Sequence, residues 1–167
     1  LSTTDKNEMP QIDFYVLQDN AADSHLRYAC RLVEKAYTLG MQVYIRSADE
    51  AMTDRLDELL WVFRDQSFIP HQREEDTAQP CAVIVNHTAP PKHREIMINL
   101  GLDASPDYAD YDRLIEVVSA VSEIKHAGRE RFRHYSQQGH QPKHHAVSYM
   151  SRPGLNSCPT NCATMLN

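Results

Sequence analysis

The sequence contains little glycine and no long apolar run, and each shortage excludes a class of protein. Only 5 of its 167 residues are glycine. None forms G-x-G-x-x-G or G-x-x-x-x-G-K-[ST], so no glycine-rich loop is present to wrap the phosphates of a nucleotide. No apolar run approaches the roughly 18 residues of a membrane span, and no signal-peptide pattern opens the chain. We therefore expect no membrane partner and no dinucleotide or P-loop site.

Cysteine is also scarce, and its four positions do not indicate a covalent or redox function. Four cysteines are too few for a disulfide scaffold of this size, and reduced thiols in a cytoplasm are expected. Cys30 lies on the apolar side of a predicted helix and Cys81 begins a predicted strand, so both are interpreted as core residues. A serine-hydrolase G-x-S-x-G pattern is absent as well.

The charge balance excludes a general nucleic-acid binder. The chain carries 17 Lys and Arg against 23 Asp and Glu, a formal net charge of -6, whereas domains that bind nucleic acid directly are usually basic. We therefore expect contact with DNA to be indirect. With 41% hydrophobic residues, a chain of this length supports one core.

The two ends of the sequence differ from its centre. Residues 1–8 (LSTTDKNE) precede Met9 and are interpreted as a leader or as residues added to the natural chain. Residues 9–139 are predicted to form a single domain. Residues 140–167 contain no Asp or Glu and are rich in Pro, Ser, Asn and His, so a flexible tail is expected there.

Strand-like and helix-like segments alternate within the predicted domain. A first helix is predicted to be capped by Asp23 or Ser24 and ended by Gly40, a second to be capped by Ser47 or Asp49, and a third to cover residues 120–138. A polar loop is expected at 64–80, and a turn-rich passage with a short helix near 102–112. Strands are predicted at 11–17, 42–46, 82–86, 95–100 and, as the last one, 113–119. This alternation predicts an α/β fold with a central, largely parallel sheet and helices on both faces.

The second helix places the only tryptophan away from its apolar side. At about 100° per residue, Trp61 points towards the side of Asp57 and Glu58. We expect Trp61 to be exposed as a binding residue, and Pro70 to fix the segment that presents Phe68; the alternative is that the 64–80 loop buries Trp61. The apolar side of this helix is formed by Met52, Leu56, Leu59, Leu60 and Phe63.

The third helix combines an apolar face with a row of cations. Lys125, Arg129 and Arg133 recur at every fourth residue along the edge of that face. The alternative is a core helix whose basic edge is only solvated, but the row also suits an acidic peptide that ends in a hydrophobic residue. Trp61 and Phe68 are expected to form the other wall of this site. The apolar face itself consists of Val121, Ile124, Gly128, Phe132 and Tyr135.

A metal site near the end of the chain is the weaker alternative. Its candidate ligands are His144, His145, Cys158 and Cys162, but their spacing matches no standard zinc arrangement. We therefore interpret the histidines as surface residues and expect no metal or other cofactor.

Four motifs carry a resemblance to a known family. MPQIDFYVL, RLDELLW, SFIPH and GRERFRHY, in that order between Met9 and Gly139, resemble the chi subunit of bacterial DNA polymerase III. The resemblance implies a Rossmann-like three-layer fold and a non-catalytic accessory subunit. It also implies two partners: the psi subunit, which tethers chi to the clamp loader, and the acidic C-terminal tail of single-stranded DNA-binding protein, which ends in phenylalanine.

The same resemblance implies a set of tail-binding residues. At one of these positions Phe132 stands where tyrosine is familiar in the family, so a phenolic hydrogen bond is lost while the ring remains. Two alternatives stay open: a divergent nucleotide-dependent enzyme of Rossmann-like fold, and a replication or repair scaffold outside the clamp loader. No signature identifies the psi interface. The implied tail-binding residues are Trp61, Phe68, Val121, Lys125, Arg129, Phe132 and Arg133.

Overall fold

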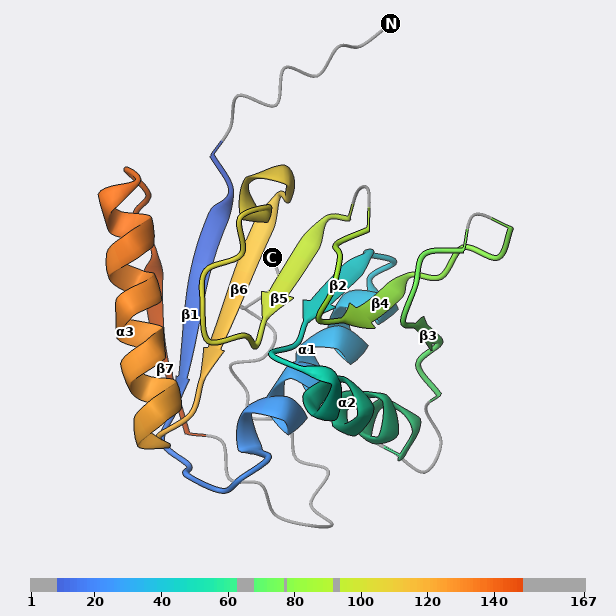
Figure 1. Ribbon diagram of the computed structural model, residues 1–167, viewed down its shortest axis with the longest axis horizontal. Coiled ribbons are helices and arrows are strands. Elements are labelled where there is room, and N and C mark those ends of the chain that lie inside the picture. Colours follow the sequence, from blue (N-terminus) through green and yellow to red (C-terminus); the bar gives the residue numbers. More distant parts are fainter. Residues whose placement is uncertain (1–8, 63–67, 77, 92–93, 149–167) are drawn as a thin grey trace, which may run out of the picture.

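A computed structural model describes residues 9–62, 68–76, 78–91 and 94–148 (Figure 1). Predictions on residues 1–8, Phe63, Cys158 and Cys162 therefore lie outside the described residues. Within the described part, no helix combines the length and the apolar character needed to cross a membrane.

In the described part of the chain, seven strands form one sheet in the order β3-β4-β2-β5-β6-β1-β7, and every neighbouring pair is parallel. The strands are β1 (Gln11–Leu17), β2 (Val43–Arg46), β3 (His71–Gln72), β4 (Val83–Asn86), β5 (Ile96–Asn99), β6 (Arg113–Val118) and β7 (Lys143–Val147). The helices are α1 (Ser24–Thr38), α2 (Glu50–Val62), the short 3-10 helix η1 (Tyr108–Asp110) and α3 (Ser122–Gln137). The predicted α/β class, the parallel sheet and the short helix near 102–112 are confirmed.

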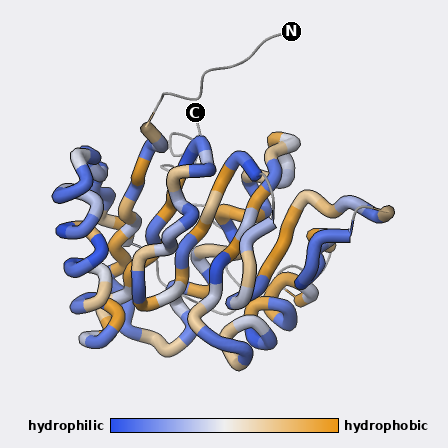
Figure 2. The backbone as a smooth tube through the Cα atoms, turned by 45° about the horizontal axis from the view of Figure 1, so that its top comes forward, coloured by the Kyte–Doolittle hydropathy of each residue, from blue (hydrophilic) through white to orange (hydrophobic). Residues whose placement is uncertain are grey.

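Strand alternation divides the core into two layers, one on each face of the sheet. On β1, Tyr15 and Leu17 pack with the apolar sides of α1 and α2, whereas Ile12 and Phe14 pack with Tyr135 of α3. Both faces are buried, as expected for a parallel sheet. Figure 2 shows the strands as mainly hydrophobic traces and α3 as a mainly hydrophilic one. The three-layer, Rossmann-like architecture is therefore confirmed.

Local capping explains where the helices begin and end. The Asp49 carboxylate accepts a hydrogen bond from the Met52 amide at 2.8 Å, so Asp49 rather than Ser47 precedes α2. Gly40 follows α1 with φ +77°, a conformation that glycine adopts without steric cost. The apolar side of α1 is buried as far as Ala36, and the following Tyr37 is exposed.

The strand β7 corrects two predictions. Residues 113–119 were expected to contain the last strand and residues 140–167 to lack regular structure, yet Lys143–Val147 pairs in parallel with β1. Only Val147 of this edge strand is buried, so it has no apolar alternation for sequence analysis to detect. Backbone pairing holds it, together with His145, which bonds to the buried Asp13 carboxylate at 2.8 Å.

A second unpredicted strand lies in the polar loop at 64–80. The two residues of β3, His71 and Gln72, pair with Val83 and Ile84 of β4 and form the opposite edge of the sheet. A strand of two half-buried polar residues carries no periodic signal.

A buried carboxylate fixes α3 on the sheet, and sequence analysis missed it. Glu116 of β6 accepts hydrogen bonds from Arg131 Nε at 2.8 Å, Tyr135 Oη at 2.7 Å and Asn99 Nδ2 at 2.9 Å. The Glu116 and Arg131 side chains are 0% and 3% exposed. Burial raises the pKa of Glu116, and the Arg131 charge opposes that rise. The available signal was a carboxylate that alternates with Leu114 and Val118 on a buried strand.

Two arginines of α3 provide a matched test of this network. Arg131→Leu leaves the Glu116 carboxylate buried without its cation, and we expect the free energy of unfolding to fall by about 3–5 kcal/mol. Arg129→Leu, at an exposed position two residues away, should change it by about 0.5 kcal/mol or less. Urea denaturation measures both, and equal effects would contradict the buried-pair interpretation.

Candidate functional site

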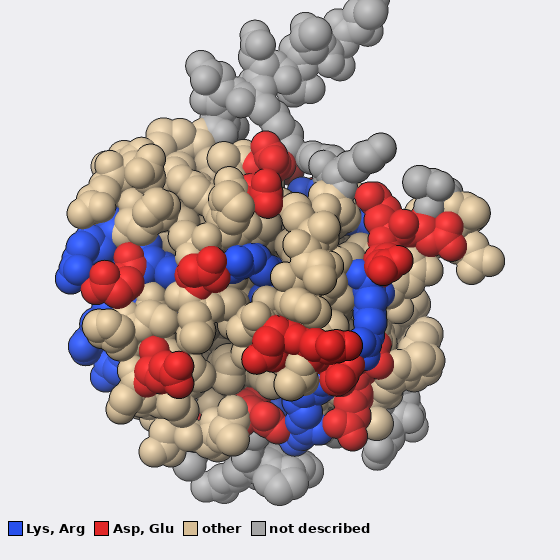
Figure 3. Space-filling view, viewed as in Figure 1, with Lys and Arg blue, Asp and Glu red and all other residues tan. Residues whose placement is uncertain are grey.

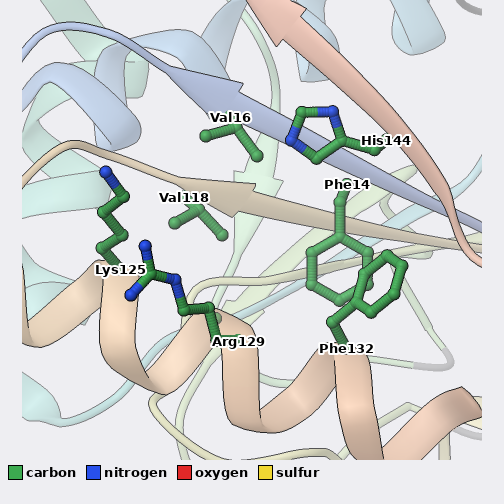
Figure 4. Close-up of a pocket in the computed structure, with 8 residues that line it drawn as sticks. Phe14, Val16, Val118, Lys125, Arg129, Phe132 and His144 are labelled. Atoms are coloured by element: carbon green, nitrogen blue, oxygen red, sulfur yellow. The ribbon is translucent and has the colours of Figure 1, made fainter.

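A pocket of about 320 Å³ lies between α3 and the β1, β6 and β7 strands (Figure 4). Its lining combines an apolar floor with two cations and one imidazole at the rim. The lining residues are Phe14, Val16, Val118, Lys125, Gly128, Arg129, Phe132 and His144.

The apolar floor of the pocket depends on the alternation of side chains along β1 and on one glycine of α3. Phe14 and Val16 alternate on β1 and both face α3, where Phe132 meets the Phe14 ring edge-on with centroids 5.2 Å apart. Gly128 brings the helix close to β6, because a Cβ on Gly128 would lie only 2.8 Å from Val118 Cγ2. The floor is therefore a rigid apolar surface made by β-strand side chains and one aromatic ring.

The rim is positively charged. Lys125 and Arg129 project over Val118 and Val16 in Figure 4, and neither forms an ion pair with any residue that the structure describes. No acidic residue is among the eight that line the pocket. Figure 3 shows basic side chains along α3 at the left margin, whereas acidic side chains gather over α2 and the β3 edge. The pocket therefore suits a ligand that carries both an anionic group and an apolar group.

The structure brings together only part of the predicted site. Lys125, Arg129 and Phe132 line the pocket, whereas Val121 is the half-buried residue that caps α3. Arg133 points away and pairs with Glu130 at 2.9 Å. The basic row thus contributes two of its three cations to the pocket. His144 was not predicted to lie here, because its position depends on the undetected strand β7.

Trp61 and Phe68 lie elsewhere, which corrects the expectation of a single two-walled site. Their side chains are 56% and 53% exposed, so the predicted exposure of Trp61 is confirmed, and their ring centroids are 4.6 Å apart. They contact His71 on the β3 edge, on the α1–α2 face of the sheet, and we call them the aromatic patch. His71 and the pocket residue His144 occupy the two edge strands, six strand intervals apart, or roughly 29 Å at the usual spacing.

The metal alternative fails for the two histidines that the structure describes. His144 lines the pocket, while the adjacent His145 bonds to Asp13 and stacks on Tyr15 at 4.9 Å. Neighbouring residues on a strand point to opposite faces, so this pair cannot share one ion. Burial raises the pKa of the Cys30 thiol to about 12, which keeps it protonated and confirms its role as a core residue.

Comparisons with known proteins agree with this fold and with the motifs. The family model described as "DNA polymerase III chi subunit, HolC" matches residues 9–143. The chain belongs to the DNA polymerase III chi subunit family. The match extends past Gly139 to the first residue of β7. The resemblance to the chi subunit family that the four motifs indicated is confirmed.

Three relatives named "DNA polymerase III subunit chi" show how far the similarity extends. The Pseudomonas aeruginosa protein is 39% identical over 139 residues, which cover 83% of this chain and 98% of the relative. The Haemophilus influenzae protein is 28% identical over 130 residues, covering 75% and 90%. The Escherichia coli protein is 24% identical over 138 residues, covering 78% and 94%. Membership of this family makes the chain an accessory subunit of the DNA polymerase III complex.

The close approach at Gly128 can be tested with a paired substitution. We expect Gly128→Ala to destabilise the protein, because overpacking costs about 1–3 kcal/mol and the better helix propensity of alanine returns only about 1 kcal/mol. In a Val118→Ala background the clashing methyl groups are gone, so the same substitution should be neutral or stabilising. Thermal unfolding of the four proteins measures the coupling, and an equal effect in both backgrounds would contradict the contact.

Proposed function

We propose that this protein is a non-catalytic adaptor that links the clamp loader, through the psi subunit, to single-stranded DNA-binding protein by binding its acidic C-terminal tail. The observation that carries the proposal is the pocket, which joins an apolar floor to two cations without ion-pair partners among the described residues. The family match favours this role over a nucleotide-dependent enzyme, and the proposal requires no cofactor.

Each part of the pocket has a counterpart in the proposed ligand. A terminal phenylalanine ring would rest on the floor beside Phe132 and Val118, in a cavity at the small end of the range for ligand sites. The guanidinium of Arg129 can hold the terminal carboxylate through two parallel hydrogen bonds, and Lys125 adds a second charge one turn away. Phe132 has no phenolic hydroxyl, so binding here would rely on ring contacts and on these two cations.

The psi subunit requires a different surface, because an adaptor must hold both partners at once. The aromatic patch supplies one at the opposite edge of the sheet, where Trp61 and Phe68 expose large rings of the kind that anchor protein interfaces. We assign the psi subunit to this patch. In this arrangement the protein reaches DNA only through the coating protein, at the replication fork in the bacterial cytoplasm.

Arg129 and Arg133 form a matched pair for testing the pocket. Arg129→Ala should weaken binding of an acidic, phenylalanine-ended peptide by about tenfold to hundredfold, since it removes charge-assisted hydrogen bonds. Arg133→Ala removes the same charge one turn away but outside the pocket, so its effect should be much smaller. Calorimetric titration measures both affinities and a melting curve verifies each fold. Equal losses of affinity in the two variants would show that the peptide responds only to net charge. An unchanged affinity in Arg129→Ala would show that Arg129 is not part of the site.

The separation of the two surfaces predicts independent effects on the two partners. Trp61→Ala should weaken binding of the psi subunit by more than about fivefold, the usual threshold for a residue that matters at an interface. The same variant should bind the acidic peptide as the wild type does, because the pocket lies across the sheet. Pull-down with purified psi and peptide titration give the two readouts. If Trp61→Ala weakened peptide binding instead, the two-surface assignment would be wrong.

A further inference from the structure

A buried histidine lies beneath the aromatic patch. The His71 side chain is only 1% exposed, although the rings it contacts are more than half exposed. It meets Trp61 edge-on, with centroids 5.6 Å apart and an interplanar angle of 72°, and its centroid lies 6.5 Å from that of Phe68. The buried His71 ring therefore packs beneath both exposed rings.

Both ring nitrogens of His71 lie within hydrogen-bond distance of an acceptor. Nδ1 lies 2.7 Å from the Ile69 carbonyl oxygen, and Nε2 lies 3.0 Å from Asp57 Oδ1. A carbonyl and a carboxylate only accept hydrogen bonds, so each ring nitrogen has to carry a hydrogen for both bonds to form. Both bonds together require the imidazolium cation.

These two bonds join the segments that carry the two exposed rings. Asp57 lies one helical turn before Trp61 on α2, and Ile69 directly follows Phe68. Loss of the proton leaves one ring nitrogen without a hydrogen, which breaks one of the two links. It also removes a positive charge from a ring whose centroid lies 5.6 Å from that of the indole, and a cation at such a distance from an aromatic ring is typically worth about 0.5–1 kcal/mol.

Charged groups of both signs lie around His71. Asp57 contacts it from α2, and Arg73 lies near the same carboxylate. Arg73 is bound to Asp54 at 2.7 Å and lies 3.8 Å from Asp57, so the Asp57 carboxylate remains available to His71. The paired strand β4 contributes Val83 and Ile84, which carry no charge.

We propose that His71, as the imidazolium, is a positioning residue that holds Trp61 and Phe68 in the arrangement that docks the psi subunit. Docking at the aromatic patch therefore weakens as His71 loses its proton. The identity of the docked partner rests on the function proposed above, whereas the effect of His71 on the two rings does not.

The single tryptophan allows this inference to be tested without any partner. An imidazolium in contact with an indole quenches its fluorescence more strongly than neutral imidazole does. Emission from Trp61 should therefore rise in one step as the pH is raised and His71 loses its proton. The step should be absent in His71→Gln, which donates one hydrogen bond but does not titrate. It should persist in His87→Gln, since His87 also lies beside α2, where it contacts Thr53. A flat wild-type curve, or the same step in His71→Gln, would overturn the inference.

A second variant keeps the test decisive if His71→Gln does not fold. Asp57→Asn preserves the side-chain shape but removes the carboxylate that stabilises the cation, so the fluorescence step should move to lower pH. An unmoved step would show that the Asp57 bond does not control the charge of His71, and the positioning role would fail.

The affinity for the psi subunit provides the functional readout. Wild-type affinity should fall by roughly twofold to fivefold across the fluorescence step, and the fall should be absent in His71→Gln, which controls for titration of psi itself. An equal fall in both proteins would overturn the docking role. Failure of psi to bind at every pH would overturn the proposed partner, while the fluorescence titration would still decide whether His71 positions the rings.

Discussion

The position of α3 depends on one buried carboxylate. Glu116 lies in the middle of the sheet with no exposed surface, and burying a charge is costly unless hydrogen bonds and a counter-charge surround it. Arg131 and Tyr135 supply these from one side of α3, which fixes the rotation of the helix about its axis. Lys125 and Arg129 are then directed to the pocket, and Gly128 allows the helix to approach β6 closely enough to close its floor.

The parallel sheet creates the separation between the pocket and the aromatic patch. The chain passes from β1 to β2 across two strand positions that are later filled by β6 and β5. This crossover carries α2 and the aromatic patch towards one edge, while α3 returns the chain to the other edge through β7. For the adaptor role proposed above, this arrangement would let two partners bind without competing for the same surface.

Local periodicity predicted the elements that bury an apolar side, and it failed where burial is slight. The strand β1 was found because it is a short, mostly apolar run, and the helix α2 was found because Leu56, Leu59 and Leu60 share one face. The edge strand β7 was missed since its residues are mostly exposed and its stability comes from backbone pairing with β1. The same failure concealed His144 as a pocket residue.

Sequence analysis placed the candidate residues of one helix relative to one another, but it could not place residues of different helices. Angular counting along α3 identified Lys125, Arg129 and Phe132, because their relative directions depend only on helix geometry. The placement of Trp61 beside them required the order of strands in the sheet, which single-sequence periodicity does not contain. Glu116 illustrates a third case: its alternation with apolar residues was visible, but its partner Arg131 could be recognised only after α3 was packed.

In the function proposed above, selectivity for an acidic ligand in an acidic protein rests on the pairing of most other arginines with carboxylates. Most described arginines have a carboxylate within 4 Å, including Arg113 with Asp13 and Arg133 with Glu130. These pairs cancel much of the positive potential over the rest of the surface, and the net charge of -6 repels anions at long range. Lys125 and Arg129 lack such partners among the described residues. In the pocket, the proposed anionic peptide would meet these two cations beside an apolar floor, whereas a bare DNA strand, which needs many cations in a row, would find too few. The paired arginines are Arg46, Arg55, Arg73, Arg94, Arg113, Arg131 and Arg133.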